Sequence, residues 1–139
     1  MNKYMLIALK LAEKAFKSGE VPIGAVIVEN GKIIGTGYNK KEKCNDVTMH
    51  AELIAIRKAC RKKKTWHLNN CEIYVTVEPC LMCIGAIQQS HIKKIYFSTH
   101  NPKFGYTKYN IAQEIEFEFG LEKANSIELL KTFFNNKRK

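Results

Sequence analysis

The sequence predicts an α/β protein: a three-layer α/β/α sandwich built on a central mixed sheet of about five strands. Two observations support this prediction. Apolar runs typical of strands alternate along the chain with stretches of helical periodicity, and the later strands are joined through helices, which makes that part of the sheet parallel. The first two strands are instead joined by a tight turn, so the sheet is mixed, and helices should cover both of its faces.

The N-terminal third is expected to form a helix and a hairpin. Apolar residues first recur at helical spacing and then form two apolar runs. Asn30-Gly31 between those runs is a signal for a tight turn, so the runs should pair as a hairpin. The polar, lysine-rich stretch 38–48 is expected to be a loop. The elements expected here are a helix over 4–16 and strands over 23–28 and 33–37.

The rest of the chain alternates helices with strands. Pro79 fits the first position of a short helix, because its missing N–H costs nothing there. The run 115–119 alternates apolar with acidic residues, which is typical of an edge or final strand. Ile127, Leu130 and Phe134 have the spacing of a closing helix. The other elements expected are helices over 50–63 and 79–89 and strands over 73–77 and 95–97.

Length and composition predict a single domain over residues 1–139. The chain has 139 residues, of which 45% are hydrophobic and 26% charged, as in globular proteins and unlike disordered or fibrous ones. It contains no stretch of about 18 apolar residues and no export signal, so we expect a cytoplasmic protein with no membrane partner. Its five cysteines indicate thiols or metal ligands in place of disulfide bonds.

The formal net charge of +10 is concentrated in the middle of the chain. Residues 1–52 carry +2, residues 53–108 carry +8 and residues 109–139 carry zero. Such a surplus favours phosphate-rich partners or anionic surfaces, while a lysine-rich run is also typical of a merely solvated surface. Both interpretations stay open on charge alone. The cations of the middle segment are Arg57, Lys58, Arg61, Lys62, Lys63, Lys64, Lys93, Lys94, Lys103 and Lys108.

Three residues, His50, Cys80 and Cys83, have side chains suited to a metal ion. Cysteines three residues apart at the start of a helix lie on one face, where both sulfurs can close on one metal. The helix N-terminus also stabilises their thiolates, and sulfur with imidazole favours zinc over magnesium or calcium. A lone Cys-x-x-Cys is equally typical of a redox pair or of two core thiols. The other cysteines have no spacing that favours ligation and are interpreted as structural or incidental: Cys44, Cys60 and Cys71.

Glu52 favours a catalytic zinc site, in which one coordination position stays open for water. A carboxylate beside such a water can take its proton and pass it on. Because residues two apart in a helix point to opposite sides, His50 and Glu52 converge only if His50 lies before the helix. The sequence places both at a loop-to-helix junction. The structural alternative for Glu52 is a partner of the helix dipole in the first turn.

The combination of His50-Ala51-Glu52 with Pro79-Cys80-Leu81-Met82-Cys83 resembles the signature of the zinc-dependent cytidine and deoxycytidylate deaminase superfamily. Within that superfamily the chain is similar to the bacterial tRNA-specific adenosine deaminases. The similarity covers roughly residues 3–105. The segments that carry it are 20–26, 37–39, 48–52, 76–87 and 90–92.

This resemblance implies a cytidine deaminase-like fold with one zinc ion per subunit. It implies that His50, Cys80 and Cys83 bind the zinc, that Glu52 shuttles protons and that Asn39 contacts the target nucleoside. The activity implied is hydrolytic deamination of adenosine to inosine at the wobble position of a tRNA anticodon. The partners implied are the anticodon arm of a tRNA and a second copy of the chain in a homodimer. Phosphate contacts would then account for the charge of the middle segment.

The segment 101–109 departs from the family pattern. Asn101 stands where the family usually has an aspartate, and a Gly-Ala-x-Gly-Ser run is missing. In the family this loop flanks the substrate entry. Loss of a negative charge next to phosphates predicts looser discrimination between RNA and DNA backbones. His91 stands where the family usually has an arginine, with a smaller expected effect.

Two other functions fit the same motifs. A deaminase of this superfamily that acts on a free base or nucleoside, with guanine deaminase the best candidate, would share the zinc site and Glu52 but has no need of a +8 segment. The salt dependence of substrate affinity separates it from a tRNA enzyme. A non-catalytic zinc module that binds RNA would have no use for Glu52, so the variant Glu52→Ala separates it from an enzyme.

Overall fold

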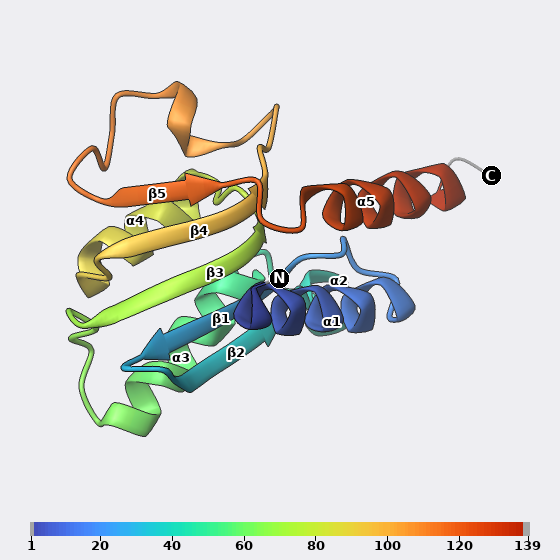
Figure 1. Ribbon diagram of the computed structural model, residues 1–139. Coiled ribbons are helices and arrows are strands. Elements are labelled where there is room, and N and C mark those ends of the chain that lie inside the picture. The colour runs from blue at the N-terminus through green and yellow to red at the C-terminus, as the bar shows by residue number, and fades with distance from the viewer. Residues whose placement is uncertain (1, 138–139) are drawn as a thin grey trace.

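The central sheet has five strands, and these span Gly24–Glu29 (β1), Lys32–Tyr38 (β2), Cys71–Val77 (β3), Lys94–Thr99 (β4) and Glu116–Phe119 (β5) (Figure 1). The computed structural model describes residues 2–137. The strand order is β2-β1-β3-β4-β5. β1 runs antiparallel to both β2 and β3, whereas β3, β4 and β5 are parallel. The predicted mixed sheet is therefore confirmed, with β5 at its edge as expected.

Helices cover both faces of the sheet, which confirms the predicted three-layer sandwich. Helices α3 (Ala51–Lys63) and α4 (Leu81–Ser90) pack on one face and enclose the larger apolar core with β1, β3 and β4. Helix α1 (Lys3–Lys17) packs on the other face through Met5 and Ala8. Helix α5 (Lys123–Lys137) runs alongside α1 and extends beyond the sheet (Figure 1). Phe133 of α5 contacts Phe16 of α1 with ring centroids 6.3 Å apart.

Two glycines of β2 allow α3 to lie unusually close to the sheet. A Cβ added at Gly35 would overlap the carbonyl oxygen of Ala55, and one added at Gly37 would overlap that of Ala51. The facing residues of the helix are also small and fully buried, including Ala55 and Ala59. This close packing fixes the distance between α3 and the sheet. It therefore also fixes the position of the N-terminal end of α3, where His50 and Glu52 are found.

A short helix, α2 (Lys41–Cys44), lies within the stretch predicted to be a loop. The carboxylate of Glu20, which is 2% exposed, accepts hydrogen bonds from the backbone N–H groups of Glu42 (3.0 Å) and Lys43 (2.8 Å). These bonds satisfy donors at the start of the helix. They come from a residue 22 positions away, so local periodicity could not predict them.

The prediction that Pro79 is the first helical residue is wrong. Helix α4 begins at Leu81, and Cys80 is its N-cap in an extended conformation. The physical reason is a contact with a distant loop. Tyr106 N–H donates to the carbonyl of Pro79 at 3.1 Å, and Cys80 forms an isolated β-bridge with Gly105. Both interactions need an extended backbone, so the helix starts after them.

The remaining helices and strands fall close to their predicted positions. A single 3₁₀ turn over Tyr106–Lys108 (η1) lies in the segment 101–109, for which no element was expected. The edge strand β5 carries two exposed phenylalanines, Phe117 and Phe119, whose rings stack beside Phe97. In residues 2–137 no helix is both long and apolar enough to span a bilayer.

Candidate metal and catalytic site

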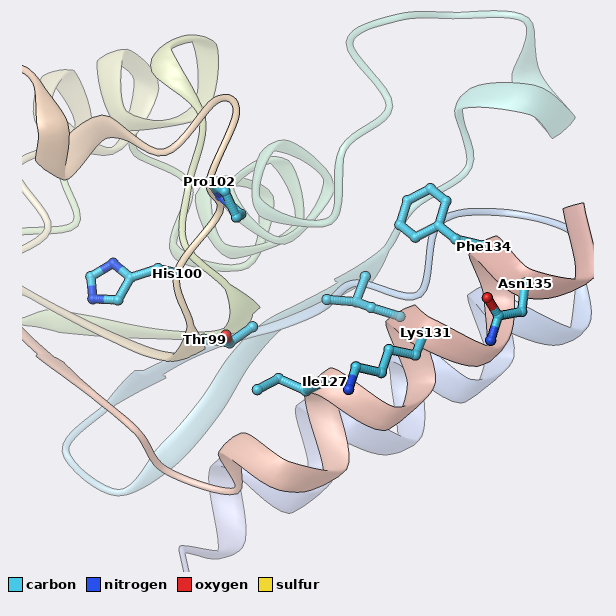
Figure 2. A pocket seen from close by; sticks show the side chains of 8 residues that line it. Thr99, His100, Pro102, Ile127, Lys131, Phe134 and Asn135 are labelled. Atoms are coloured by element: carbon cyan, nitrogen blue, oxygen red, sulfur yellow. The ribbon is translucent and has the colours of Figure 1, made fainter. Parts of the chain in front are cut away.

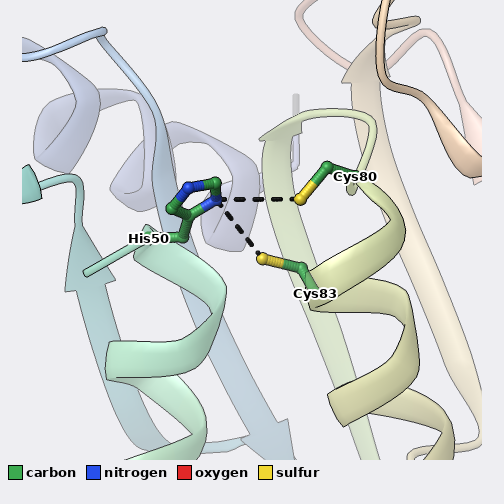
Figure 3. Close-up of side chains that lie close together, drawn as sticks. All are labelled: His50, Cys80 and Cys83. Atoms are coloured by element: carbon green, nitrogen blue, oxygen red, sulfur yellow. Dashed lines mark hydrogen bonds between the residues drawn. The ribbon is translucent and has the colours of Figure 1, made fainter. Parts of the chain in front are cut away.

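His50, Cys80 and Cys83 meet at the N-terminal ends of α3 and α4 (Figure 3). Their candidate ligand atoms all lie within 4.8 Å of one another. His50 Nδ1 is 3.8 Å from the Sγ of Cys80 and 3.5 Å from the Sγ of Cys83. The structure therefore brings together the three residues that the sequence analysis named as metal ligands. His50 is 30 positions from Cys80 and 33 positions from Cys83 in the sequence.

The three side chains fit a zinc ion. With Zn–S of about 2.3 Å and Zn–N of about 2.0 Å, tetrahedral geometry places nitrogen and sulfur about 3.5 Å apart, close to the separations observed. Two thiols and an imidazole are donors that zinc prefers. Within residues 2–137, no fourth His, Cys, Asp or Glu joins this group. Three protein ligands leave one position for water or substrate, which is the pattern of a catalytic site.

Both His50 and Cys80 are N-cap residues, and neither uses its side chain to cap its helix. His50 has φ −85° and ψ 149°, so it lies before the helix, as the convergence of His50 with Glu52 required. The N-termini of α3 and α4 thus point toward the same place. Their partial positive charges favour thiolate ligands there.

The two cysteines differ in acidity because they share a hydrogen bond. The thiol of Cys83 donates to Cys80, and this bond together with His50 lowers the pKa of Cys80 to about 4. The same bond and burial raise the pKa of Cys83 above its usual range. Cys80 is therefore a thiolate at neutral pH, ready to serve as a ligand.

Glu52 lies in the first turn of α3 with its carboxyl group buried beside the metal residues. Its side chain is 3% exposed, and its Oε1 has no hydrogen-bond partner among the described residues. Burial raises its pKa to about 7, and the charges of Cys80 and His50 also act on it. A carboxyl group that titrates near neutral pH can both take and give a proton.

Asn39 reaches the same helix terminus from the end of β2. Its side-chain Oδ1 accepts a hydrogen bond from the backbone N–H of Ala51 at 2.8 Å, and the residue is buried. This bond holds the first turn of α3, and therefore His50 and Glu52, against the sheet. The side-chain oxygen of Asn39 therefore already has a partner within the protein. Its side-chain NH₂ group is the part suited to donate a hydrogen bond to a ligand.

Glu78 is a buried residue to which sequence reasoning assigned no role. It directly follows β3 and precedes Pro79-Cys80, and its carboxylate binds the loop that contains Asn101 and Thr107. Burial by itself raises its pKa, but the hydrogen bonds from Thr107 and Asn101 outweigh burial and lower the pKa below its usual value. The sequence feature that could have indicated a role for Glu78 is its position, an acidic residue between an apolar strand and the cysteine motif.

Asn101 shapes the loop 101–109. Its Oδ1 accepts a hydrogen bond from Phe104 N–H at 3.1 Å, and its carbonyl oxygen accepts one from Gly105 N–H at 3.0 Å. An aspartate oxygen could accept the first bond equally well. The difference between this chain and the family pattern at position 101 is therefore mainly one of charge.

A pocket of about 360 Å³ lies between α5 and the beginning of this loop (Figure 2). Its wall combines apolar side chains of α5 with two groups that can carry positive charge, His100 and Lys131. Figure 2 shows His100 and Pro102 on the loop side and Ile127, Lys131 and Phe134 on the helix side. The pocket therefore adjoins the loop that binds Glu78.

Most cations of the middle segment are exposed. Lys63 and Lys94 form ion pairs with Glu29 and Glu118 at 2.6 and 3.0 Å. Arg57 Nη1 lies 3.7 Å from Sδ of Met49, which precedes His50, so a cation adjoins the metal residues. The exposed cations of this segment are Arg57, Lys58, Arg61, Lys62, Lys64, Lys93, Lys103 and Lys108.

An exposed aromatic cluster lies among these cations, at the C-terminal ends of α3 and α4. The Trp66 ring stacks on the His67 ring with centroids 3.8 Å apart, and the His91 ring lies 5.8 Å from Trp66. Trp66 is 57% exposed. His91 therefore stacks at the surface, where the family usually has arginine.

The other three cysteines lie outside the metal group. Cys44 is exposed, Cys60 is half-buried and Cys71 is buried. Burial and the neighbouring Glu29 raise the pKa of Cys71 to about 11, so its thiol is inert. These positions agree with the interpretation of the three residues as structural or incidental.

Comparison with known proteins places this site in a family. The model of the cytidine and deoxycytidylate deaminase zinc-binding region matches residues 1–99. A tRNA-specific adenosine deaminase of Aquifex aeolicus is 42% identical over 97% of this chain and 94% of its own length. The protein of the same name from Bacillus subtilis is 40% identical over 98% of this chain and 89% of its own length.

Solved structures show the same fold. One from a study of A-to-I editing by tRNA:A34 deaminases at the wobble position superposes with a TM-score of 0.86 and 36% identity, over 91% of this chain and 98% of the other. A guanine deaminase of Bacillus subtilis gives a TM-score of 0.70 and 37% identity, over 76% of this chain and 72% of the other. The chain belongs to the cytidine and deoxycytidylate deaminase family, in the branch of the tRNA-specific adenosine deaminases.

Proposed function

We propose that this enzyme, a single deaminase domain over residues 1–139, converts adenosine to inosine at the wobble position of a tRNA anticodon. In this reaction water replaces the exocyclic amine at carbon 6 of adenine, and ammonia leaves. The observation that carries the proposal is the buried carboxyl group of Glu52, with one oxygen left without a hydrogen-bond partner, beside the group His50, Cys80 and Cys83. The relatives named as tRNA-specific adenosine deaminases support the choice of substrate.

Glu52 is the residue that we assign to proton transfer. With a pKa of about 7 it can accept a proton from the attacking water, deliver it to the ring nitrogen N1 of adenine, and then serve the departing amine. His50, Cys80 and Cys83 would hold the zinc, whose Lewis acidity lets water act as a nucleophile near neutral pH. Asn39 would contact the nucleoside through its side-chain amide.

The surface around the site supports a nucleic acid as substrate. Near the site lie exposed Arg57 of α3, the lysines of the loop 101–109 and the exposed ring of Phe104. Further exposed cations extend along α3 to its C-terminal end, where exposed Trp66 offers a second aromatic face. Cations that bind phosphates and aromatic rings that stack on bases are the two features of proteins that bind single-stranded nucleic acids. An anticodon loop is already unpaired, so its bases can enter an active site at a reduced energetic cost.

Assembly as a homodimer is part of the proposal. Leu81 and Met82 in the first turn of α4 are exposed although they flank the metal ligands. A second copy packed over this turn would bury them and enlarge the RNA-binding surface of a small domain. We also place the enzyme in the cytoplasm, where tRNA is found.

The test is a comparison of substrates. The zinc-loaded protein is incubated with a synthetic anticodon arm that carries adenosine at the wobble position, and separately with free adenosine, cytidine and guanine. We expect ammonia release from the arm at a much higher kcat/KM than from any free compound. Apparent affinity for the arm should also fall steeply as salt rises.

Turnover of guanine in place of the arm, with an affinity that salt barely changes, would contradict the proposal. Guanine deaminase is the competing function, because a guanine deaminase of Bacillus subtilis shares the fold at 37% identity. Such an enzyme binds a neutral base and gains nothing from the phosphate-binding surface.

A further inference from the structure

We propose that Glu78 is a positioning residue that anchors the segment 100–107 to the end of β3, and thereby sets the shape of the entrance beside Cys80. The inference deepens the proposed function, since the entrance matters for a substrate that approaches along this loop.

The side chain of Glu78 is almost completely enclosed and serves three donors of the loop. Its Oε1 accepts hydrogen bonds from Asn101 N–H at 3.0 Å and from the imidazole Nδ1 of His100 at 2.9 Å. Its Oε2 accepts one from Thr107 N–H at 2.7 Å. The side chain of Glu78 is 2% exposed, against 44% for His100. One carboxylate thus binds both the beginning and the end of the segment.

The loop lies directly on the carboxylate. A Cβ added at Gly105 would overlap both carboxylate oxygens and Cδ of Glu78, so a larger residue there would displace the carboxylate or the loop. The backbone reinforces this contact on either side. Glu78 N–H donates to Thr99 at 2.8 Å, Tyr106 N–H donates to Pro79 at 3.1 Å, and Cys80 bridges to Gly105.

These contacts join the loop to the residues that precede the metal ligand. Glu78, Pro79 and Cys80 form one continuous strip of extended chain, and the loop pairs with each of them. The position of the loop relative to Cys80 is therefore set mainly at Glu78. His50 and Glu52 come from another helix, so this anchoring is separate from the proton-transfer group.

The anchored segment displays side chains suited to a single-stranded nucleic acid. Phe104 is 64% exposed, and Tyr109, just beyond the segment, is 46% exposed. Each of the two rings directly follows a lysine. The Lys108 ammonium group binds the carbonyl oxygens of Pro102 and Lys103 at 3.1 and 2.6 Å, which folds the loop on itself. If Glu78 released the loop, these rings would no longer have a fixed place beside the site.

A carboxylate is needed because all three partners donate. The side chain of glutamine has one acceptor oxygen and one NH₂ group, and that group would face an N–H of the loop. Glu78→Gln keeps the size of the side chain and should lose the contact at one end of the loop. Glu78→Asp keeps two acceptor oxygens and should restore part of it.

The first readout is proteolysis, which needs no substrate. Trypsin cleaves after Lys103, within the anchored segment, and after Lys108, directly beyond it, so the rate of cleavage at these sites reports how firmly the loop is held. We expect Glu78→Gln to be cut there about tenfold faster than the unmodified zinc-loaded protein, and Glu78→Asp to be intermediate. Glu72→Gln, the same change on β3 at a residue outside these contacts, should behave like the unmodified protein.

The second readout separates positioning from a structural role. In Glu78→Gln we expect one zinc per chain, a KM for the anticodon arm raised about tenfold and a kcat changed less than about twofold. Gly105→Ala adds a Cβ that overlaps the carboxylate, so it forces the loop and Glu78 apart while leaving Glu78 itself unsubstituted. It should reproduce both effects, even where Glu78→Gln folds poorly.

Unchanged tryptic cleavage in both Glu78→Gln and Gly105→Ala would overturn the proposal, and so would loss of zinc in both variants. A kcat that falls while KM stays constant would assign Glu78 to the chemistry and also overturn it. If the unmodified protein fails to deaminate the anticodon arm, the proposed function fails, while tryptic cleavage still decides whether Glu78 anchors the loop.

Discussion

His50 and Cys80 occupy positions where a side chain normally accepts a hydrogen bond from the first turn of a helix. Neither does so, and the two face each other across the gap between α3 and α4 (Figure 3). Helices α3 and α4 therefore both lack a side-chain N-cap hydrogen bond. In return, the backbone at each helix start fixes the direction of one metal-binding side chain. Glu52 adds a buried carboxyl group of which one oxygen, Oε1, has no hydrogen-bond partner among the described residues. Such a combination is costly for stability and is explained by catalysis.

Glu52→Ala tests the assigned proton transfer. We expect ammonia release to fall at least about 100-fold, because a positioned acid and base is lost. The protein should keep one zinc and lose no thermal stability, since the change removes a buried group with an unsatisfied oxygen. Ammonia release, zinc content and melting temperature are measured on the same preparation. Loss of zinc together with unfolding would show that Glu52 is structural.

Thiol labelling tests the ligand assignment by residue. With zinc bound, an alkylating reagent should modify exposed Cys44 and spare Cys80 and Cys83. After chelation Cys80 should react quickly, because its pKa is held near 4, whereas Cys71, with a pKa raised to about 11, should stay slow. Mass spectrometry of the peptides reads out each site. Equal labelling of Cys80 with and without zinc would contradict its role as a ligand.

At the scale of elements, the sequence predicted what local patterns encode. Helical spacing located α3, and the Cys-x-x-Cys spacing located the start of the next helix, so the metal residues could be named. The start of α4 was predicted at Pro79 but lies at Leu81. The bridge between Cys80 and Gly105 that keeps this stretch extended is a tertiary contact, which local sequence does not encode. Helix α2 and the anchoring role of Glu78 were missed for the same reason. Each depends on a buried carboxylate whose partners lie 22 or more positions away in sequence.

Asn101 in the loop 101–109 is predicted to loosen the discrimination between RNA and DNA substrates. Because Asn101 makes its hydrogen bond through an oxygen that an aspartate also has, Asn101→Asp should keep the loop and add one negative charge. We expect this variant to act less well on a DNA hairpin relative to the matched RNA hairpin. The ratio of the two rates, compared with that of the unmodified protein, is the measurement. An undetectable DNA rate in the unmodified protein would refute the looser discrimination predicted for Asn101.

At the scale of the whole molecule, exposed cations lie on both faces of the sandwich. Those of the middle segment lie on α3 or directly after it and in the loops that follow α4 and β4, whereas α1 on the opposite face carries lysines of its own. The charge of +8 in the middle segment favours an anionic partner. The aromatic cluster of Trp66, His67 and His91 lies within that cationic region.

Removing charges from one face at a time tests which face of the molecule binds tRNA. Replacing Arg61, Lys62 and Lys64 by glutamine should weaken tRNA binding and reduce the slope of log affinity against log salt by up to about 2. The matched control replaces Lys10, Lys14 and Lys17 of α1 by glutamine, which removes the same charge from the opposite face. Binding is followed by the fluorescence of Trp66, the single tryptophan. Equal losses from both triple variants would show a non-specific charge effect.

The central claim is that this metal site deaminates one adenosine of a tRNA. It is tested most directly by locating inosine in a full-length tRNA, with adenosine at the wobble position, after incubation with the zinc-loaded protein. Digestion and mass spectrometry of the anticodon fragment identify the position. We predict inosine at the wobble position, and none there after chelation of the zinc or with Glu52→Ala. Inosine spread over other loops of the tRNA, or a wobble adenosine left intact by protein that deaminates free guanine, would contradict the claim.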